Sequence, residues 1–179
     1  SMDNVLTNKR YAVSSIPGAI SLLKDLTSVR LSNNNLSHIP KYISNLQNLI
    51  VLELAYNKFK SFPINICTLT NLKTLNLSNN EINFLPDDIN TLTKLECLNL
   101  TNSHLYGISK NIMLPNLTHL YINKNNLSKI PKWIYYSKSL KYVGHNLTIP
   151  FSKIFRNNKY IANDGQIMVC DLFKIVLQL

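Results

Sequence analysis

The segment "LKTLNLSNNEINFLPDDINTLTK", residues 72–94, is one copy of a 23-residue pattern that decides the fold. Its leucines follow neither the helical period of about 3.6 nor the strand period of two for long. The spacing L-x-x-L-x-L-x-x-N-x-L-x-x-I-P-x-x-I-x-x-L-x-x recurs in residues 26–48, 49–71, 95–116 and 117–139, and the copy at 95–116 is one residue short. A fixed period of this length predicts a solenoid, in which each unit buries its apolar side against its neighbours.

Each copy is expected to form a strand, a turn and a short helix. In residues 72–94 the leucines on either side of Asn76 face inward, and Asn76 faces outward, as in a half-buried strand. Asn80, at position nine, is expected to satisfy backbone groups that the turn leaves unpaired, so stacked copies form a ladder. The ladder should be weakest where Ser103 replaces the asparagine. Pro86, at position fifteen, favours a short helix or 3₁₀ turn on the convex side.

The template resembles intracellular leucine-rich repeat proteins whose repeats end in I/L-P-x-x-I-x-x-L, including Ras-suppressor-like and Scribble-type scaffolds. The resemblance covers roughly residues 26–150. It implies an α/β right-handed solenoid with a curved parallel sheet on the concave side and short helices or 3₁₀ turns on the convex side. It also implies a non-catalytic interaction module or scaffold that binds a protein partner through the concave sheet.

The pattern degenerates at both ends of the chain. Residues 3–25 are expected to form a degenerate N-terminal capping repeat, with a poor strand half around Leu6. Residues 26–139 hold five repeats, and residues 140–179 form a degenerate sixth repeat and a C-terminal cap. Residues 151–179 leave the pattern altogether and either cap the last repeat or dock a partner. Trp133 and Tyr135 are expected on the convex side, packed under this tail or forming a second sticky patch.

Candidate binding residues are the outward positions of adjacent strands, which should form rows on the concave sheet. Tyr56 and Tyr121 are the expected anchors, since tyrosine is enriched at binding hot spots. Asn79 is expected on an exposed row, where substitution changes stability little. The predicted partner-binding set is Arg30, Glu53, Tyr56, Asn76, Asn99, His119, Tyr121, Lys124 and Tyr142. The central row is Arg30, Glu53, Asn76, Asn99 and Tyr121; the flanking row is Asn33, Tyr56, Asn79, Asn102 and Lys124; the third is Ser28, Val51, Thr74, Cys97, His119 and Tyr142.

Charge is distributed unevenly along the chain, whose formal net charge is +10. No acidic residue occurs between Glu96 and Asp164, whereas that interval holds Lys110, Lys124, Lys129, Lys132, Lys138, Lys141, Lys153, Arg156 and Lys159. This basic half predicts a protein partner with an acidic surface. The alternative is a nucleic-acid or anionic-membrane-surface binder that uses the basic half. Nucleic acid is the less favoured ligand, because the lysines lack the arginine-rich, aromatic-interleaved pattern of a dedicated site.

Neither a catalytic nor a cofactor or metal site is predicted. Cys97 and His119 occupy the same position in successive repeats and should lie about one strand spacing apart, but no orienting carboxylate accompanies them. The three cysteines, which include Cys67 and Cys170, are widely spaced and form no cap cluster, so they predict reduced thiols and a cytoplasmic protein. The protein is expected to be a monomer. The longest apolar run, at the C-terminus, contains Asp171 and is too short to span a bilayer.

Overall fold

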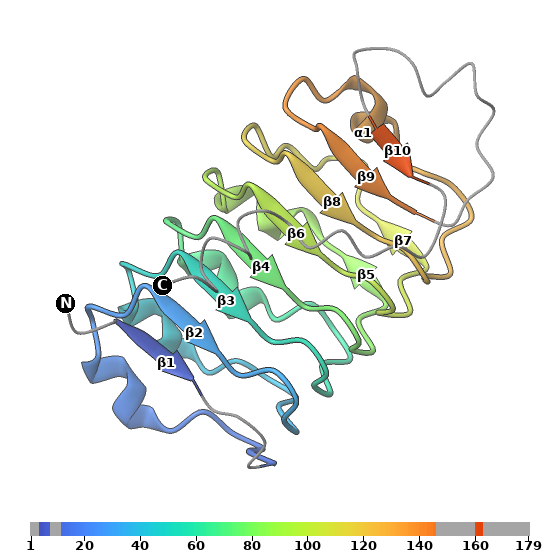
Figure 1. Ribbon diagram of the computed structural model, residues 1–179. Helices are drawn as coiled ribbons and strands as arrows, with labels where there is room; N and C mark the ends of the chain where they lie inside the picture. Colours follow the sequence, from blue (N-terminus) through green and yellow to red (C-terminus); the bar gives the residue numbers. More distant parts are fainter. Residues whose placement is uncertain (1–3, 8–11, 146–159, 163–179) are drawn as a thin grey trace.

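The computed structural model describes residues 4–7, 12–145 and 160–162, and these residues build an eight-stranded parallel sheet backed by short helices. The strands lie side by side in the order in which they occur in the chain (Figure 1). The α/β solenoid expected from the sequence is therefore confirmed. The eight strands are β1 (Val5–Thr7), β2 (Ser28–Arg30), β3 (Val51–Glu53), β4 (Thr74–Asn76), β6 (Cys97–Asn99), β8 (His119–Tyr121), β9 (Tyr142–Gly144) and β10 (Tyr160–Ala162).

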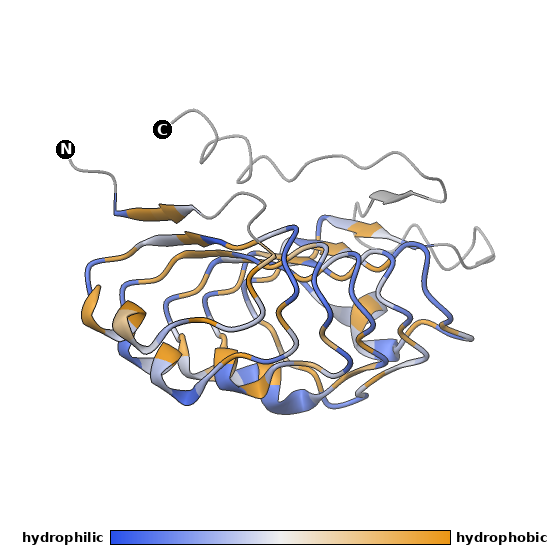
Figure 2. Cartoon of the chain, turned by 90° about the horizontal axis from the view of Figure 1, so that it is seen from below, coloured by the Kyte–Doolittle hydropathy of each residue, from blue (hydrophilic) through white to orange (hydrophobic). Residues whose placement is uncertain are grey.

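Strand register keeps equivalent template positions in line across the sheet. Leu75 pairs with Leu52 on one side and Leu98 on the other, and all three are fully buried. Inward leucines and isoleucines from the helices meet these residues, so a single apolar core runs the length of the solenoid. Figure 2 shows apolar residues on both the strands and the helices that enclose this core.

Each helix begins directly after a proline, as the sequence predicted. Proline fixes φ and lacks an N–H, so it ends the preceding strand and suits the start of a helix. The helices lie on the side opposite to the sheet (Figure 2). They are the 3₁₀ helices η1 (Gly18–Leu22), η2 (Lys41–Asn45), η3 (Ile64–Thr68) and η4 (Asp87–Thr91), and the α-helix α1 (Lys132–Tyr136). The residues immediately before them are Pro17, Pro40, Pro63, Pro86 and Pro131.

The fourth repeat departs from this plan. It carries Ser109 where the others carry proline, and no helix forms between η4 and α1. A short strand, β7 (Gly107–Ile108), instead pairs with β5 (Phe84–Leu85) in a second, two-stranded parallel sheet. A Cβ atom at Gly107 would lie 2.9 Å from the Phe84 ring, so glycine permits this close approach. The sequence did not predict this sheet.

The buried asparagine ladder is present. The amide nitrogen of Asn80 donates to the carbonyls of Leu54 and Leu77, each at 3.0 Å, and its amide oxygen accepts from the Phe59 N–H at 3.1 Å. The Leu54 contact crosses to the preceding repeat, so the side chain joins two units. At the position of the missing asparagine, the Ser103 hydroxyl donates to the Leu77 carbonyl at 3.1 Å. The asparagines of the ladder are Asn34, Asn57, Asn80 and Asn125.

Both ends of the solenoid contain strands that the template did not show clearly. The poor strand half around Leu6 forms β1, in which Leu6 pairs with Val29. Within the segment that leaves the repeat pattern, residues 160–162 form β10, which pairs in parallel with β9 and so extends the sheet. The capping or docking role expected of the remaining tail, including Asp171 and Cys170, lies outside the described residues.

Trp133 lies beside the irregular fourth repeat, and the tail that was expected to cover it lies outside the described residues. Its ring is partly buried against the core, and its Nε1–H donates to the Ser109 carbonyl at 3.2 Å. The tryptophan of α1 therefore lies on the irregular backbone of the fourth repeat. Ile134 is buried, as the template predicted.

Candidate binding surface

Three rows of outward side chains cross the concave side of the sheet in the predicted order. In the central row Glu53 pairs with Arg30 and with Asn76 on its two neighbouring strands, and the row continues to Asn99 and Tyr121. Its first four members are half-buried. In the third row every residue except the half-buried His119 is buried, so this row offers little accessible surface.

The flanking row has an unusual backbone conformation. Position eight of each repeat has a positive φ, which L-residues avoid because their Cβ approaches the following carbonyl. Asparagine tolerates this conformation better than most residues. The φ values are 61° at Asn33, 55° at Tyr56, 55° at Asn79, 53° at Asn102 and 54° at Lys124. The repeat imposes the conformation, and the chain satisfies it with asparagine in three of these five positions.

Tyr56 combines this unfavourable backbone with a side chain that is 58% exposed. Its N–H donates to the Ser78 carbonyl at 3.0 Å, and the N–H of Asn79 donates to the Thr101 carbonyl at 2.8 Å in the same way. The backbone of position eight therefore extends the sheet ladder to the next repeat, whichever side chain it carries. The two lysines that follow Tyr56 in the turn, Lys58 and Lys60, are both exposed.

His119, Tyr121 and Tyr142 form an aromatic cluster at the C-terminal half of the sheet. The ring centroids of Tyr121 and Tyr142 lie 5.0 Å apart, and His119 stacks on both rings at 6.4 and 6.2 Å. These spacings are within the range of favourable aromatic pairs. Tyr121 is only 4% exposed, so in this structure it presents far less surface than Tyr56.

Several polar members of the predicted set make contacts within the protein. Arg30 forms an ion pair with Glu53, with 3.5 Å between Nε and Oε1. Burial raises the pKa of Glu53, and the Arg30 charge lowers it in part. Asn76 and Asn99 accept hydrogen bonds from the N–H groups two residues ahead, at 3.0 and 2.9 Å. These contacts fix the central row as a polar, ordered surface.

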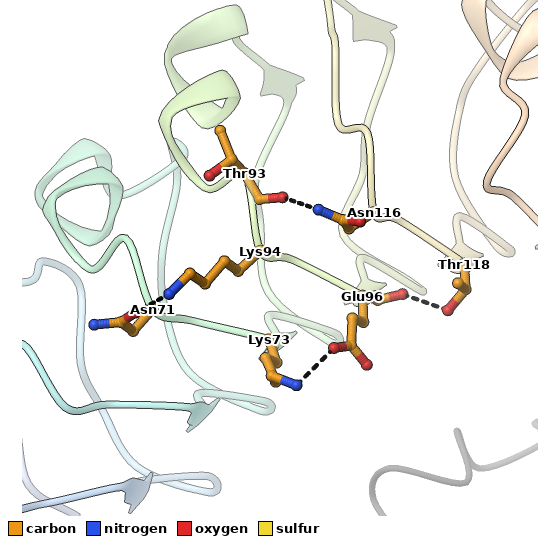
Figure 3. Close-up of polar contacts among 7 residues, drawn as sticks. All are labelled: Asn71, Lys73, Thr93, Lys94, Glu96, Asn116 and Thr118. Carbon is orange, nitrogen blue, oxygen red and sulfur yellow. Dashed lines mark hydrogen bonds and ion pairs between the residues drawn. The ribbon is translucent and has the colours of Figure 1, made fainter.

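A chain of polar contacts also joins the repeats where the strands begin (Figure 3). Lys73 pairs with Glu96 at 2.9 Å, and Lys94 donates to the Asn71 amide oxygen at 2.6 Å. Asn116 donates to the Thr93 carbonyl at 2.8 Å, and Thr118 donates to the Glu96 carbonyl at 2.9 Å. Here the polar side chains bind adjacent repeats to one another, so this edge is a structural feature.

The Cys97–His119 neighbourhood shows no arrangement for catalysis. The two residues pair across β6 and β8, as predicted. Cys97 is fully buried, however, and His119 Nδ1 lies 2.8 Å from the Thr118 hydroxyl. A thiol that is shielded from solvent has no access to a substrate. Within the described residues, no three histidine, cysteine or acidic side chains gather as metal ligands.

Cys67, on η3, gives a testable prediction. Burial raises the pKa of its thiol to about 11; a hydrogen bond with Thr91 lowers it and Asp88 raises it further. Because only the thiolate reacts, we expect iodoacetamide at pH 8 to alkylate native Cys67 roughly a hundredfold more slowly than the unfolded residue. Mass spectrometry over time measures both rates. The denatured, unreduced protein should take up three groups, and equal native and denatured rates would contradict the expectation.

The repeating strands and the buried asparagine ladder are features of a repeat protein, and the comparison with known families gives the same result. The family model described as a leucine-rich repeat region matches residues 6–113, more than half of the chain, and a second leucine-rich repeat model matches residues 116–136. The chain belongs to the leucine-rich repeat family. A search of curated proteins gave no match.

Leucine-rich repeat domains generally mediate protein–protein interaction and are generally non-catalytic. In the described part of this leucine-rich repeat protein, no helix has the length and apolar character needed to cross a membrane.

Some exposed side chains were absent from the predicted set. Met113 and Tyr136 are 74% and 72% exposed on the convex side, and Tyr106 is also exposed beside Phe84. All of them lie in or next to the irregular fourth repeat. The sequence signal that locates them is the missing residue and missing proline of that repeat.

Proposed function

We propose that this leucine-rich repeat protein binds a protein partner through its concave sheet and the adjoining row at position eight. Tyr56 is the main anchor. The family supports a protein partner in general terms, and the ordered polar rows supply a mixed interface of the kind that such partners contact. The partner surface is acidic, and the protein acts as a monomeric, non-catalytic module.

The observation that carries this proposal is the conformation of Tyr56. A tyrosine with a φ of 55° is less stable than an asparagine there, and its exposed ring gains little from packing within the protein. The tyrosine therefore lowers the stability of the fold, and the packing of its exposed ring against the described residues does not offset this loss. A large exposed aromatic side chain is instead well suited to fill a pocket on a partner.

Charge near Tyr56 supports an acidic partner. Lys58 and Lys60 are exposed in the turn that follows it. Glu53 balances the nearby Arg30 charge, and the exposed Glu81, at the position of Lys58 in the next repeat, offsets one of the two lysines, so a small positive excess remains on this side. Exposed lysines at the rim of an interface mainly accelerate association with an oppositely charged surface.

A Tyr56→Asn variant tests the proposal, because it removes the ring while supplying the residue that the backbone prefers. We expect the variant to be as stable as the wild type or more stable, by up to about 1 kcal/mol. We expect dissociation from the partner to be at least about tenfold faster, since loss of an anchor acts mainly on the dissociation rate. The partner is first isolated by quantitative pulldown with the wild type and with Tyr56→Asn as bait. Its dissociation rate from each immobilised protein is then measured.

Tyr106→Asn is the matched control, because Tyr106 is an exposed tyrosine outside the three rows. It should leave the dissociation rate unchanged. Equal dissociation rates for the wild type and Tyr56→Asn would contradict the proposed anchor. Tight binding of unrelated oligonucleotides, with a steep salt dependence and no effect of Tyr56→Asn, would favour the nucleic-acid alternative.

We place this function in the cytoplasm. The support is the absence of a cysteine cluster from the sequence, together with the free thiol of Cys67 on η3. Three alkylated cysteines in the unreduced, denatured protein are the result expected for a reducing compartment.

A further inference from the structure

The missing helix of the fourth repeat leaves a groove on the convex side. Regular repeats place their 3₁₀ helices next to one another, from η1 to η4. Between η4 and α1 the chain instead runs through residues 109–116 without a helix. Ile112 and Leu114 of this segment are buried, so the chain lies close to the core and leaves space outside it. The space has a volume of about 770 Å³.

Hydrogen bonds to both neighbouring repeats hold the floor of this groove. The Asn90 amide donates to the Asn111 carbonyl at 3.0 Å and accepts from the Met113 N–H at 2.7 Å. Asn116 donates to the Thr93 carbonyl at 2.8 Å (Figure 3). On the other side Trp133 donates to the Ser109 carbonyl. These side chains satisfy backbone groups that a helix would have paired, so the groove is formed before any ligand binds.

The lining is apolar and partly exposed, which suits an apolar anchor. Met113, on the floor segment, and Tyr136, at the end of α1, are both largely exposed, and neither side chain forms a hydrogen bond in the described contacts. Methionine adapts its shape to different partners, and tyrosine is a common hot-spot residue. The apolar side chains of the lining are Ile112, Met113, Leu114, Pro115, Trp133 and Tyr136.

The charges around the groove select the kind of ligand. Lys138 is the only charged residue among the described lining residues, and Lys110 and Lys132 lie close by in the chain, on the floor segment and at the start of α1. Two carboxylates, Asp87 and Asp88, are exposed on the neighbouring η4, and Asp87 accepts a hydrogen bond from Asn111 at 3.2 Å; the three lysines therefore leave a small positive excess around the described part of the groove. We propose that this groove is a second binding site, which takes a peptide segment of a partner protein with large apolar side chains flanked by acidic residues.

Trp133 is the only tryptophan in the chain, so its fluorescence reports directly on the groove. The probes are synthetic 12-residue peptides without tryptophan or tyrosine, whose Leu-Phe cores are flanked by Asp and Glu, by Lys and Arg, or by Ser. We expect saturable changes in Trp133 emission with the acidic-flanked peptide. We expect at least tenfold weaker binding of the basic-flanked peptide, with the Ser-flanked peptide in between. Absence of a saturable change with any peptide, or equal affinities for all three, would overturn the proposal.

Two substitutions of exposed side chains test whether the peptides bind in the groove, and neither removes a side chain that forms the hydrogen bonds of its floor. Met113→Asp changes an exposed side chain and should abolish the emission change, whereas Lys138→Glu should reverse the preference between acidic-flanked and basic-flanked peptides. Retained binding in Met113→Asp would overturn the assignment. Sedimentation that shows a dimer in the wild type but a monomer in Met113→Asp would assign the groove to a second copy of this chain instead. Tyr56→Asn should leave peptide binding unchanged, so the proposal for the groove is tested independently of the proposal for the concave site.

Discussion

Replacing Phe59 by alanine is expected to lower the free energy of unfolding by about 3–5 kcal/mol. Phe59 is fully buried and is the largest such side chain in the described residues. Removing the ring loses its transfer free energy and leaves a cavity that the close-packed core fills only partly. Because each repeat is stable only through contact with its neighbours, a defect in the second repeat also weakens the first and the third.

Denaturant titration followed by circular dichroism measures this loss. Phe59→Leu is the conservative comparison, because Leu36 and Leu105 occupy the same template position in other repeats. We expect Phe59→Leu to cost under about 1.5 kcal/mol. Phe84→Ala, at a partly exposed phenylalanine on β5, is the second control and should cost clearly less than Phe59→Ala. Similar losses for Phe59→Ala and Phe84→Ala would mean that the core is assigned wrongly.

The second large effect is expected at the asparagine ladder, where Asn80→Ala should cost about 1–3 kcal/mol. The change removes the amide that bonds the carbonyls of Leu54 and Leu77 and the N–H of Phe59. These backbone groups lie in the core, where water does not replace the lost partner. Asn80→Asp should be more damaging still, because a carboxylate would face two carbonyl oxygens in place of a donor.

The control for Asn80→Ala must be an exposed asparagine whose backbone conformation tolerates alanine. The sequence suggested Asn79, but that expectation is wrong: Asn79 is half-buried, has a φ of 55° and accepts from the Asn102 amide at 2.9 Å. Alanine there would add the cost of a left-handed conformation. Asn83 is exposed in the same repeat and is the better match, so Asn83→Ala should cost under about 0.5 kcal/mol. Equal losses for Asn80→Ala and Asn83→Ala in urea titration would refute the ladder's role.

The fold was predictable because its period is written into the spacing of apolar residues. Leu75 and its equivalents must face one another if each repeat is to bury its apolar side, and this requirement sets the strand register and the three concave rows. The prolines then set where each helix begins. By the same logic the one-residue deletion marked the fourth repeat as irregular, but it did not reveal the groove that replaces the helix.

The parts that sequence reasoning missed depend on neighbours that a periodic template does not contain. The template separates inward from outward positions, but the exposure of an outward residue depends on adjacent side chains, as the cluster of Tyr121 with Tyr142 shows. The strand β10 was missed because its spacing from β9 differs from 23 residues. The positive φ at position eight did leave a signal, namely the asparagine at three of the five equivalent positions.

That row of left-handed residues has a consequence for how the protein can acquire new specificities during evolution. The N–H at position eight bonds to the next repeat whichever side chain the position carries, and Asn79 and Asn102 add one side-chain hydrogen bond between their repeats. A new side chain at Asn33 therefore changes the exposed surface at a cost of about 1 kcal/mol, whereas at Asn79 or Asn102 the loss of that hydrogen bond adds to the cost. Substitutions at position eight leave the buried asparagine at position nine and its hydrogen bonds in place. A combinatorial library confined to these three asparagines would vary the binding surface while preserving the scaffold.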